Sequence, residues 1–165
     1  MLPHPHATNP GQESVWDYPR PPRVEAEPRP IEIILGGELI ASTSRAWRVL
    51  ETSHPPVYYI PRQDVIPGAL ELVPGASSFC EWKGRAVYYD VLGGGERRPR
   101  AAWSYPDPTE LAGKLEGALA FYAGHMDHCT VGGEVVTPQP GGFYGGWITS
   151  WVSGPFKGEP GSWGW

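Results

Sequence analysis

Short apolar runs, broken by glycine and proline, make up most of this chain. Residues 31–35 and 39–41 are apolar runs joined by Gly36-Gly37. Two such runs around Gly-Gly are typical of a β-hairpin with a primed turn. The same pattern recurs at 127–137 around Gly132-Gly133, and at 86–105 around a run of three glycines. Three hairpins predict a mainly β fold.

Further short strands are expected at 57–60, 70–72 and 76–80, the last two separated by Pro74-Gly75, and residues 46–50 either continue extended or form one turn. Helical spacing is clear only in residues 109–119, where Leu111 and Leu115 are four apart. Two glycines inside this window limit it to a turn or two of helix. Another helical turn is expected from Asp64, as its cap, to Gly68.

The chain of 165 residues holds 22 Gly and 20 Pro, which favours turns over long elements. Eight Trp, eight Tyr and four Phe argue against disorder, because such rings need burial. Residues 1–30 are proline-rich and predict an extended arm, with Trp16 and Tyr18 holding it to the rest. We expect one β domain over 31–140, and a glycine- and tryptophan-rich tail over 141–165 that packs on it.

Composition also limits partners and location. A net charge of −5 offers no basic surface for nucleic acid, and no run reaches the 18 apolar residues of a membrane span. The first residues lack the apolar segment of a secretory signal, and two cysteines cannot form a disulfide framework. We therefore expect a cytoplasmic protein without nucleic-acid or membrane partners, and no cofactor is predicted.

Cys80 and Lys83 are the first candidates for chemistry. A thiolate is the nucleophilic form of cysteine, and a nearby ammonium lowers the thiol pKa. A turn between the two could bring Lys83 over Cys80, with His54, His125 or His128 as the base. The structural alternative is a small buried cysteine beside a surface lysine.

His125, Asp127 and Cys129 would share one face of a strand and are metal-ligand types. They match no standard zinc spacing, so the favoured interpretation is a solvated loop entering a strand, and no metal site is predicted. A Cys80–Cys129 thiol pair is a further alternative.

An aromatic set close to turns is the third candidate. A small-molecule site is mostly apolar with a few placed polar groups. We predict that such a pocket uses His54, Tyr58, Tyr59, Trp82, Tyr88, Trp103 and Tyr105. In Tyr58-Tyr59 and Tyr88-Tyr89 the neighbours must point to opposite faces. Lys83, Lys157 or Arg62 could anchor a carboxylate or phosphate. The alternative is that these rings form a sheet core.

Several separate blocks, in order over residues 31–136, resemble the family called domain of unknown function 427. The most distinctive is Cys80-x-x-Lys83-Gly84-x-Ala86-x-Tyr88-Tyr89. The other blocks are residues 36–42, 48–51, 54–65, 102–106 and 117–122, and the flanking Trp16-Asp-Tyr-Pro and Gly/Trp-rich segments resemble those of its longer members. The resemblance implies a small fold similar to the Mss4-like β-tent, without that fold's Cys-pair zinc site. It implies no activity: some members carry a nucleotidyltransferase label, yet this chain lacks a Gly-Ser followed by a paired Asp-x-Asp for Mg²⁺.

Three functional hypotheses remain open. The first is a small-molecule-binding β domain whose pocket includes Cys80 and Lys83. The second is a thiol-dependent enzyme with Cys80 as nucleophile. The third is a protein-interaction module that uses the proline-rich arm and the tryptophan-rich tail, whose aromatic residues would also serve a homodimer contact.

Overall fold

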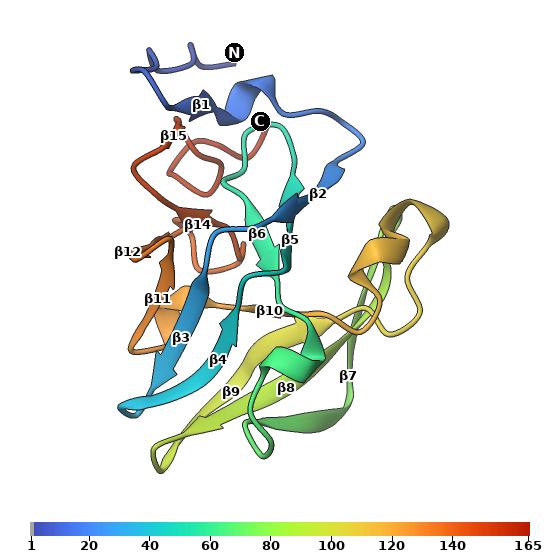
Figure 1. The fold of residues 1–165 in the computed structure, drawn as a ribbon. Helices are drawn as coiled ribbons and strands as arrows, with labels where there is room; N and C mark the ends of the chain where they lie inside the picture. Colours follow the sequence, from blue (N-terminus) through green and yellow to red (C-terminus); the bar gives the residue numbers. More distant parts are fainter. Residues whose placement is uncertain (1) are drawn as a thin grey trace.

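Strands dominate the computed structural model, which describes residues 2–165 (Figure 1). The predicted mainly β class is confirmed, and the helical segments described are four short 3-10 helices. None of these helices, within residues 2–165, has the length and apolar content needed to cross a bilayer.

Two of the predicted hairpins build the first antiparallel sheet, in the strand order β12-β11-β3-β4. Its strands are β3 (Ile31–Leu35), β4 (Glu38–Thr43), β11 (His128–Val131) and β12 (Glu134–Val135). Both glycines of each Gly-Gly turn have positive φ, as a primed turn requires. The two hairpins join where β3 pairs with β11, with Cys129 opposite Ile33.

The second sheet has the order β10-β9-β8-β7 and contains the longest strands. They are β7 (Leu70–Cys80), β8 (Gly84–Gly93), β9 (Glu96–Ser104) and β10 (Leu119–Phe121). The prediction of two separate strands around Pro74-Gly75 is wrong, because β7 runs through them. The register with β8 shifts between Leu72 and Ser77, so the extra residues bulge without ending the strand.

A three-stranded sheet, β2-β5-β6, lies between these sheets and the chain ends (Figure 1). Its strands are β2 (Arg23–Glu27), β5 (Ala46–Leu50) and β6 (Val57–Tyr59). Two small pairs complete the strands, namely β1 (Glu13–Ser14) with β15 (Val152–Ser153), and β13 (Thr137–Pro138) with β14 (Trp147–Ile148). Residues 13–27 of the expected arm therefore contribute two strands.

The 3-10 helices correct two details of the prediction. They span Val15–Asp17, Arg62–Asp64, Glu110–Leu115 and Ala123–His125. The expected turn from Asp64 to Gly68 lies earlier: Asp64 ends a helix, and its carboxylate accepts hydrogen bonds from Thr43 and Arg45. In the third helix Leu115 is buried as expected, whereas Leu111 is 68% exposed because the tighter 3-10 turn moves it out of the apolar face.

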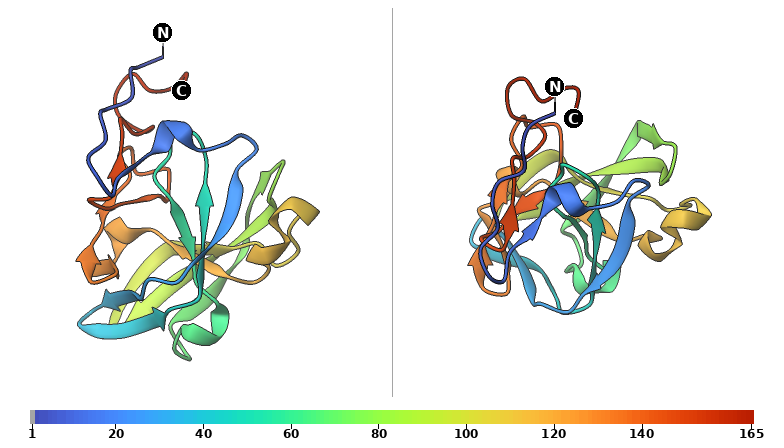
Figure 2. Two further views of the ribbon diagram at one scale, coloured as in Figure 1. Left: turned by 45° about the horizontal axis from the view of Figure 1, so that its top comes forward. Right: turned by 90° about the horizontal axis from the view of Figure 1, so that it is seen from above.

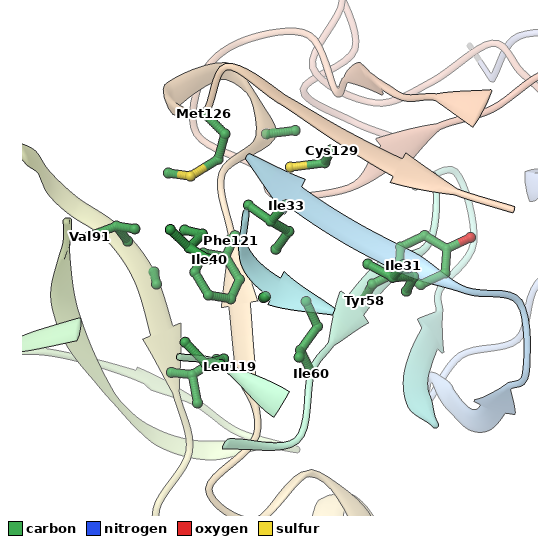
Figure 3. Packing of buried hydrophobic residues seen from close by; sticks show 14 of the residues in the cluster. Ile31, Ile33, Ile40, Tyr58, Ile60, Val91, Leu119, Phe121, Met126 and Cys129 are labelled. Atoms are coloured by element: carbon green, nitrogen blue, oxygen red, sulfur yellow. The ribbon is translucent and has the colours of Figure 1, made fainter. Parts of the chain in front are cut away.

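The main core lies between the first two sheets (Figure 3). Ile33, Leu35 and Phe121 are at most 1% exposed, and each such side chain contributes roughly 1.5–3 kcal/mol through burial. Trp147 of the tail also lies in this core and donates its indole N–H to the Phe121 carbonyl at 3.0 Å. The tail is thus a structural part of the fold.

The N-terminal and C-terminal segments lie together at one end of the molecule (Figure 2). The Trp16 indole N–H donates to the Pro155 carbonyl at 2.9 Å, and Tyr18 is 6% exposed. Arg48 of β5 holds Glu13 and Glu25 on either side of it. Burial alone would raise the pKa of Glu13, but hydrogen bonds from Arg48 and Tyr18 outweigh it and keep that pKa below its ordinary value. The division into arm, domain and tail stays a prediction.

Candidate functional site

A cavity of about 490 Å³ opens over a second cluster of buried residues, beside strands β5 and β6. Its walls come from those strands, the β7–β8 turn, β9 and the loop that follows Gln139. The structure brings eight of the nine candidate residues to this one cavity: His54, Tyr59, Cys80, Trp82, Lys83, Tyr88, Trp103 and Tyr105. They come from segments up to 51 positions apart, and the tail supplies a further wall.

Tyr58 is the candidate that lies elsewhere. Consecutive side chains of a strand point to opposite faces, so β6 sends Tyr59 to the cavity and Tyr58 to the main core. There Tyr58 lies beside Ile31 (Figure 3), with its ring centroid 5.2 Å from that of Trp147. Tyr88 and Tyr89 divide in the same way, with Tyr88 at the cavity and Tyr89 against the main core.

Aromatic rings form most of the apolar lining. Trp103 lies 4.6 Å, centroid to centroid, from Tyr122, and Tyr59 lies 6.3 Å from Tyr105. The Tyr59 hydroxyl is buried next to Trp103 and Tyr105 but makes no hydrogen bond of normal geometry within residues 2–165. Burial raises the pKa of Tyr59, so it stays a neutral hydroxyl.

The turn Glu81–Lys83 joins β7 to β8 and places the Cys80 and Lys83 side chains at the cavity. Its backbone is held by the loop before the third 3-10 helix, since Thr109 N–H donates to the Lys83 carbonyl at 3.0 Å. Lys83 Nζ lies 5.0 Å from the Trp82 ring centroid and 5.6 Å from that of Tyr105. Cys80 is half-buried, and its thiol is free.

His54 and Gln139 form the polar end of the cavity. Gln139 Oε1 accepts the Gly146 N–H at 3.0 Å, so its Nε2 must be the group that donates to the Lys157 carbonyl at 2.8 Å. The same Nε2 lies 3.1 Å from His54 Nδ1. Nδ1 therefore accepts, and neutral His54 carries its proton on Nε2, which lies 3.8 Å from Glu51.

The protonation of His54 follows from its surroundings. Burial lowers its pKa to about 4, and the nearby charges of Lys157, Arg20 and Lys83 act in the same direction. His54 is therefore a neutral N–H donor at physiological pH. The three cations also establish a positive potential here, in a chain whose net charge is −5.

The other sequence candidates lie apart from this cavity. Cys129 faces the main core at 1% exposure, away from the second cluster that holds Cys80, so the two thiols do not pair. Asp127 accepts the Gly37 N–H at 2.8 Å and so holds a hairpin turn. Within residues 2–165, no group of three His, Cys, Asp or Glu side chains could hold a metal ion.

Sequence reasoning missed part of the lining. It did not select Tyr122, Gln139, Phe143 or Tyr144, all of which line the cavity. The aromatic richness of the tail was the available signal for Phe143 and Tyr144, but it did not show which surface the tail covers. Gln139 lies in a proline-rich stretch without periodicity, so its role as the partner of His54 needed the tertiary structure.

Comparison with known proteins is consistent with the motifs. No curated protein matches the chain. The model of the family described as Domain of unknown function (DUF427) matches residues 23–132, which include β2, the Cys80–Tyr89 segment and most of the cavity strands. By this match, the chain belongs to the DUF427 family.

Proposed function

We propose that this domain binds a small molecule in the aromatic cavity beside Cys80 and Lys83. The observation that carries the proposal is the convergence of separate segments on a space of about 490 Å³. Ligand sites typically have about 300–1,000 Å³ and an apolar lining with few polar groups. Here the polar groups are two lysines, one thiol, one glutamate and the His54–Gln139 pair, beside the Ser78 and tyrosine hydroxyls.

The competing interpretation is that the rings merely complete a sheet core. A core of that kind packs tightly and leaves few voids larger than a water molecule. The main core does so around Ile33, Leu35 and Phe121. The second cluster instead leaves an open space with an ammonium and a thiol at its wall, which supports a ligand site.

A thiol-dependent enzyme is the second candidate, because the half-buried Cys80 lines the same cavity. In such an enzyme the thiolate is supplied by a base beside the thiol or by a cation that lowers the thiol pKa. The basic nitrogen of His54 already accepts from Gln139, and neither His125 nor His128 lines the cavity, which leaves Lys83 as the group that could activate Cys80. Because no histidine base is in place within residues 2–165, binding without covalent chemistry is the better-supported function.

Fragment screening by ligand-observed NMR tests the proposal. We expect flat aromatic fragments to bind the full chain and to lose binding in Tyr88→Leu, which removes a cavity wall. Tyr89→Leu is the matched control, because its ring is next in sequence but lies against the main core. Absence of any binder, or equal loss in both folded variants, would contradict the proposal.

A further inference from the structure

Lys83 carries a charge that has no partner in the part of the chain that the structure describes. Within residues 2–165 its Nζ makes neither a hydrogen bond nor an ion pair, and its neighbours are the faces of Trp82 and Tyr105. Lys157, the other lysine at the cavity, donates to the main-chain oxygen of Trp165 at 3.2 Å. Lys83 therefore has free hydrogen-bonding capacity for an acceptor brought by a ligand.

His54 is a second donor at the wall. Neutral His54 offers the Nε2–H, because Gln139 occupies its Nδ1. A ligand that accepts from both the Lys83 ammonium and the His54 N–H must present acceptor oxygens at that end.

The charges at the wall limit the charge of that ligand. Two lining ammonium groups, Lys83 and Lys157, face one lining carboxylate, Glu51, and the guanidinium of Arg20 adds a third positive charge near the neutral His54. The positive charges therefore outnumber the negative one, and this excess favours an anionic ligand.

Resting on the proposed function, we propose that the cavity takes an organic carboxylate with a flat apolar body. Lys83 binds its carboxylate, and the rings of Trp82, Trp103 and Tyr105 contact the body. An aromatic carboxylic acid has both parts in one rigid molecule. The ligand is thus selected by the charge of Lys83 at one end and by ring stacking along its length.

Calorimetry on the full chain with 2-naphthoate and its neutral amide, 2-naphthamide, tests this assignment. We expect the acid to bind at least about tenfold more tightly than the amide, the range of one charge-assisted hydrogen bond. Lys83→Met keeps the apolar stem on the two rings and should remove this advantage without changing amide binding. Lys114→Met is the control, because Lys114 Nζ lies 5.3 Å from the Trp47 ring in a similar contact outside the cavity.

Glu51→Gln provides an opposite test, since removing a like charge should strengthen acid binding several-fold. Equal binding of acid and amide would overturn the charge class while leaving the cavity as a binding site. Loss of acid binding in Lys114→Met as large as in Lys83→Met would overturn the assignment to Lys83. If neither compound binds and the fragment screen is also empty, the proposed function itself fails.

Discussion

Gln139 donates its side-chain amide to His54 Nδ1 at 3.1 Å, across 85 positions of sequence. Because Gln139 is held in turn by Gly146 and Lys157, the amide cannot reverse without losing two backbone hydrogen bonds. The pair therefore places a neutral imidazole, with its N–H on Nε2, at the wall of the cavity. This contact connects the segment after β13 to the loop between β5 and β6 and decides which ring nitrogen of His54 carries the proton.

The low pKa of His54 predicts an acid-dependent loss of stability. Unfolded His54 binds a proton near pH 6.5, whereas the folded protein resists protonation until about pH 4. The stability that neutral His54 contributes is fully present above pH 6.5. As the pH falls toward 4, the free energy of unfolding decreases by up to about 3 kcal/mol. Urea unfolding across this range should show a steeper decline for the native chain than for His54→Gln. Titration of His54 near pH 6.5 in the folded protein, followed by NMR, would contradict it.

Gly145 controls how closely the tail approaches Trp103. A Cβ added at Gly145 would overlap the Trp103 ring, so Gly145→Ala must displace either the loop or the ring. We expect about 1–3 kcal/mol of destabilisation, as for other overpacked sites, and a change in tryptophan fluorescence. Gly164→Ala is the control, since a Cβ there meets nothing within 4 Å and should change stability by under about 0.5 kcal/mol. Equal effects of the two substitutions would contradict this packing.

The two thiols should react with iodoacetamide at very different rates. Cys129 is 1% exposed, and burial raises its pKa, so its thiolate is scarce and shielded. We expect Cys80 to be alkylated in the native protein and Cys129 only upon unfolding, with mass spectrometry separating the two sites. Native labelling of Cys129 as fast as that of Cys80 would disprove its placement. Rapid labelling of Cys80 below neutral pH would favour the thiol-enzyme alternative.

Arg48 predicts how firmly the N-terminal segment is attached. Arg48→Met leaves Glu13 and Glu25 without their shared guanidinium. Because both carboxylates keep about a third of their exposure, we expect roughly 2 kcal/mol of destabilisation, less than for a fully buried pair. Limited proteolysis should then cleave near residue 18 sooner.

Arg45→Met is the matched control, because Arg45 pairs with Asp64 at the surface and should matter much less. Adding Glu13→Gln to Arg48→Met should recover part of the stability, since it removes one uncompensated charge. Equal proteolysis of both single variants would argue against Arg48 as the attachment.

Local rules accounted well for the hairpins. Each Gly-Gly turn follows from the positive φ of its two glycines, and the strands beside it follow from their apolar alternation. What these rules did not show is that two turns touch. A Cβ on Gly94 would overlap the backbone of Gly36, so the β3–β4 and β8–β9 turns pack backbone against backbone. A steric contact between segments 58 positions apart cannot be recognised from the sequence pattern of either segment.

By itself, then, the sequence determined the β class, the turns, the family motif and most of the residue types at the cavity. Because side chains alternate along a strand, Tyr58 and Tyr59 of β6 must point to opposite faces. Only the tertiary structure decided that Tyr59 faces the cavity and Tyr58 the main core. It also decided that Lys83 has no hydrogen-bond or ion-pair partner among residues 2–165 and that Gln139 orients His54. The physical reason is that backbone propensity and alternation act between near neighbours, whereas a binding site depends on which distant side chains the packing of whole sheets brings together.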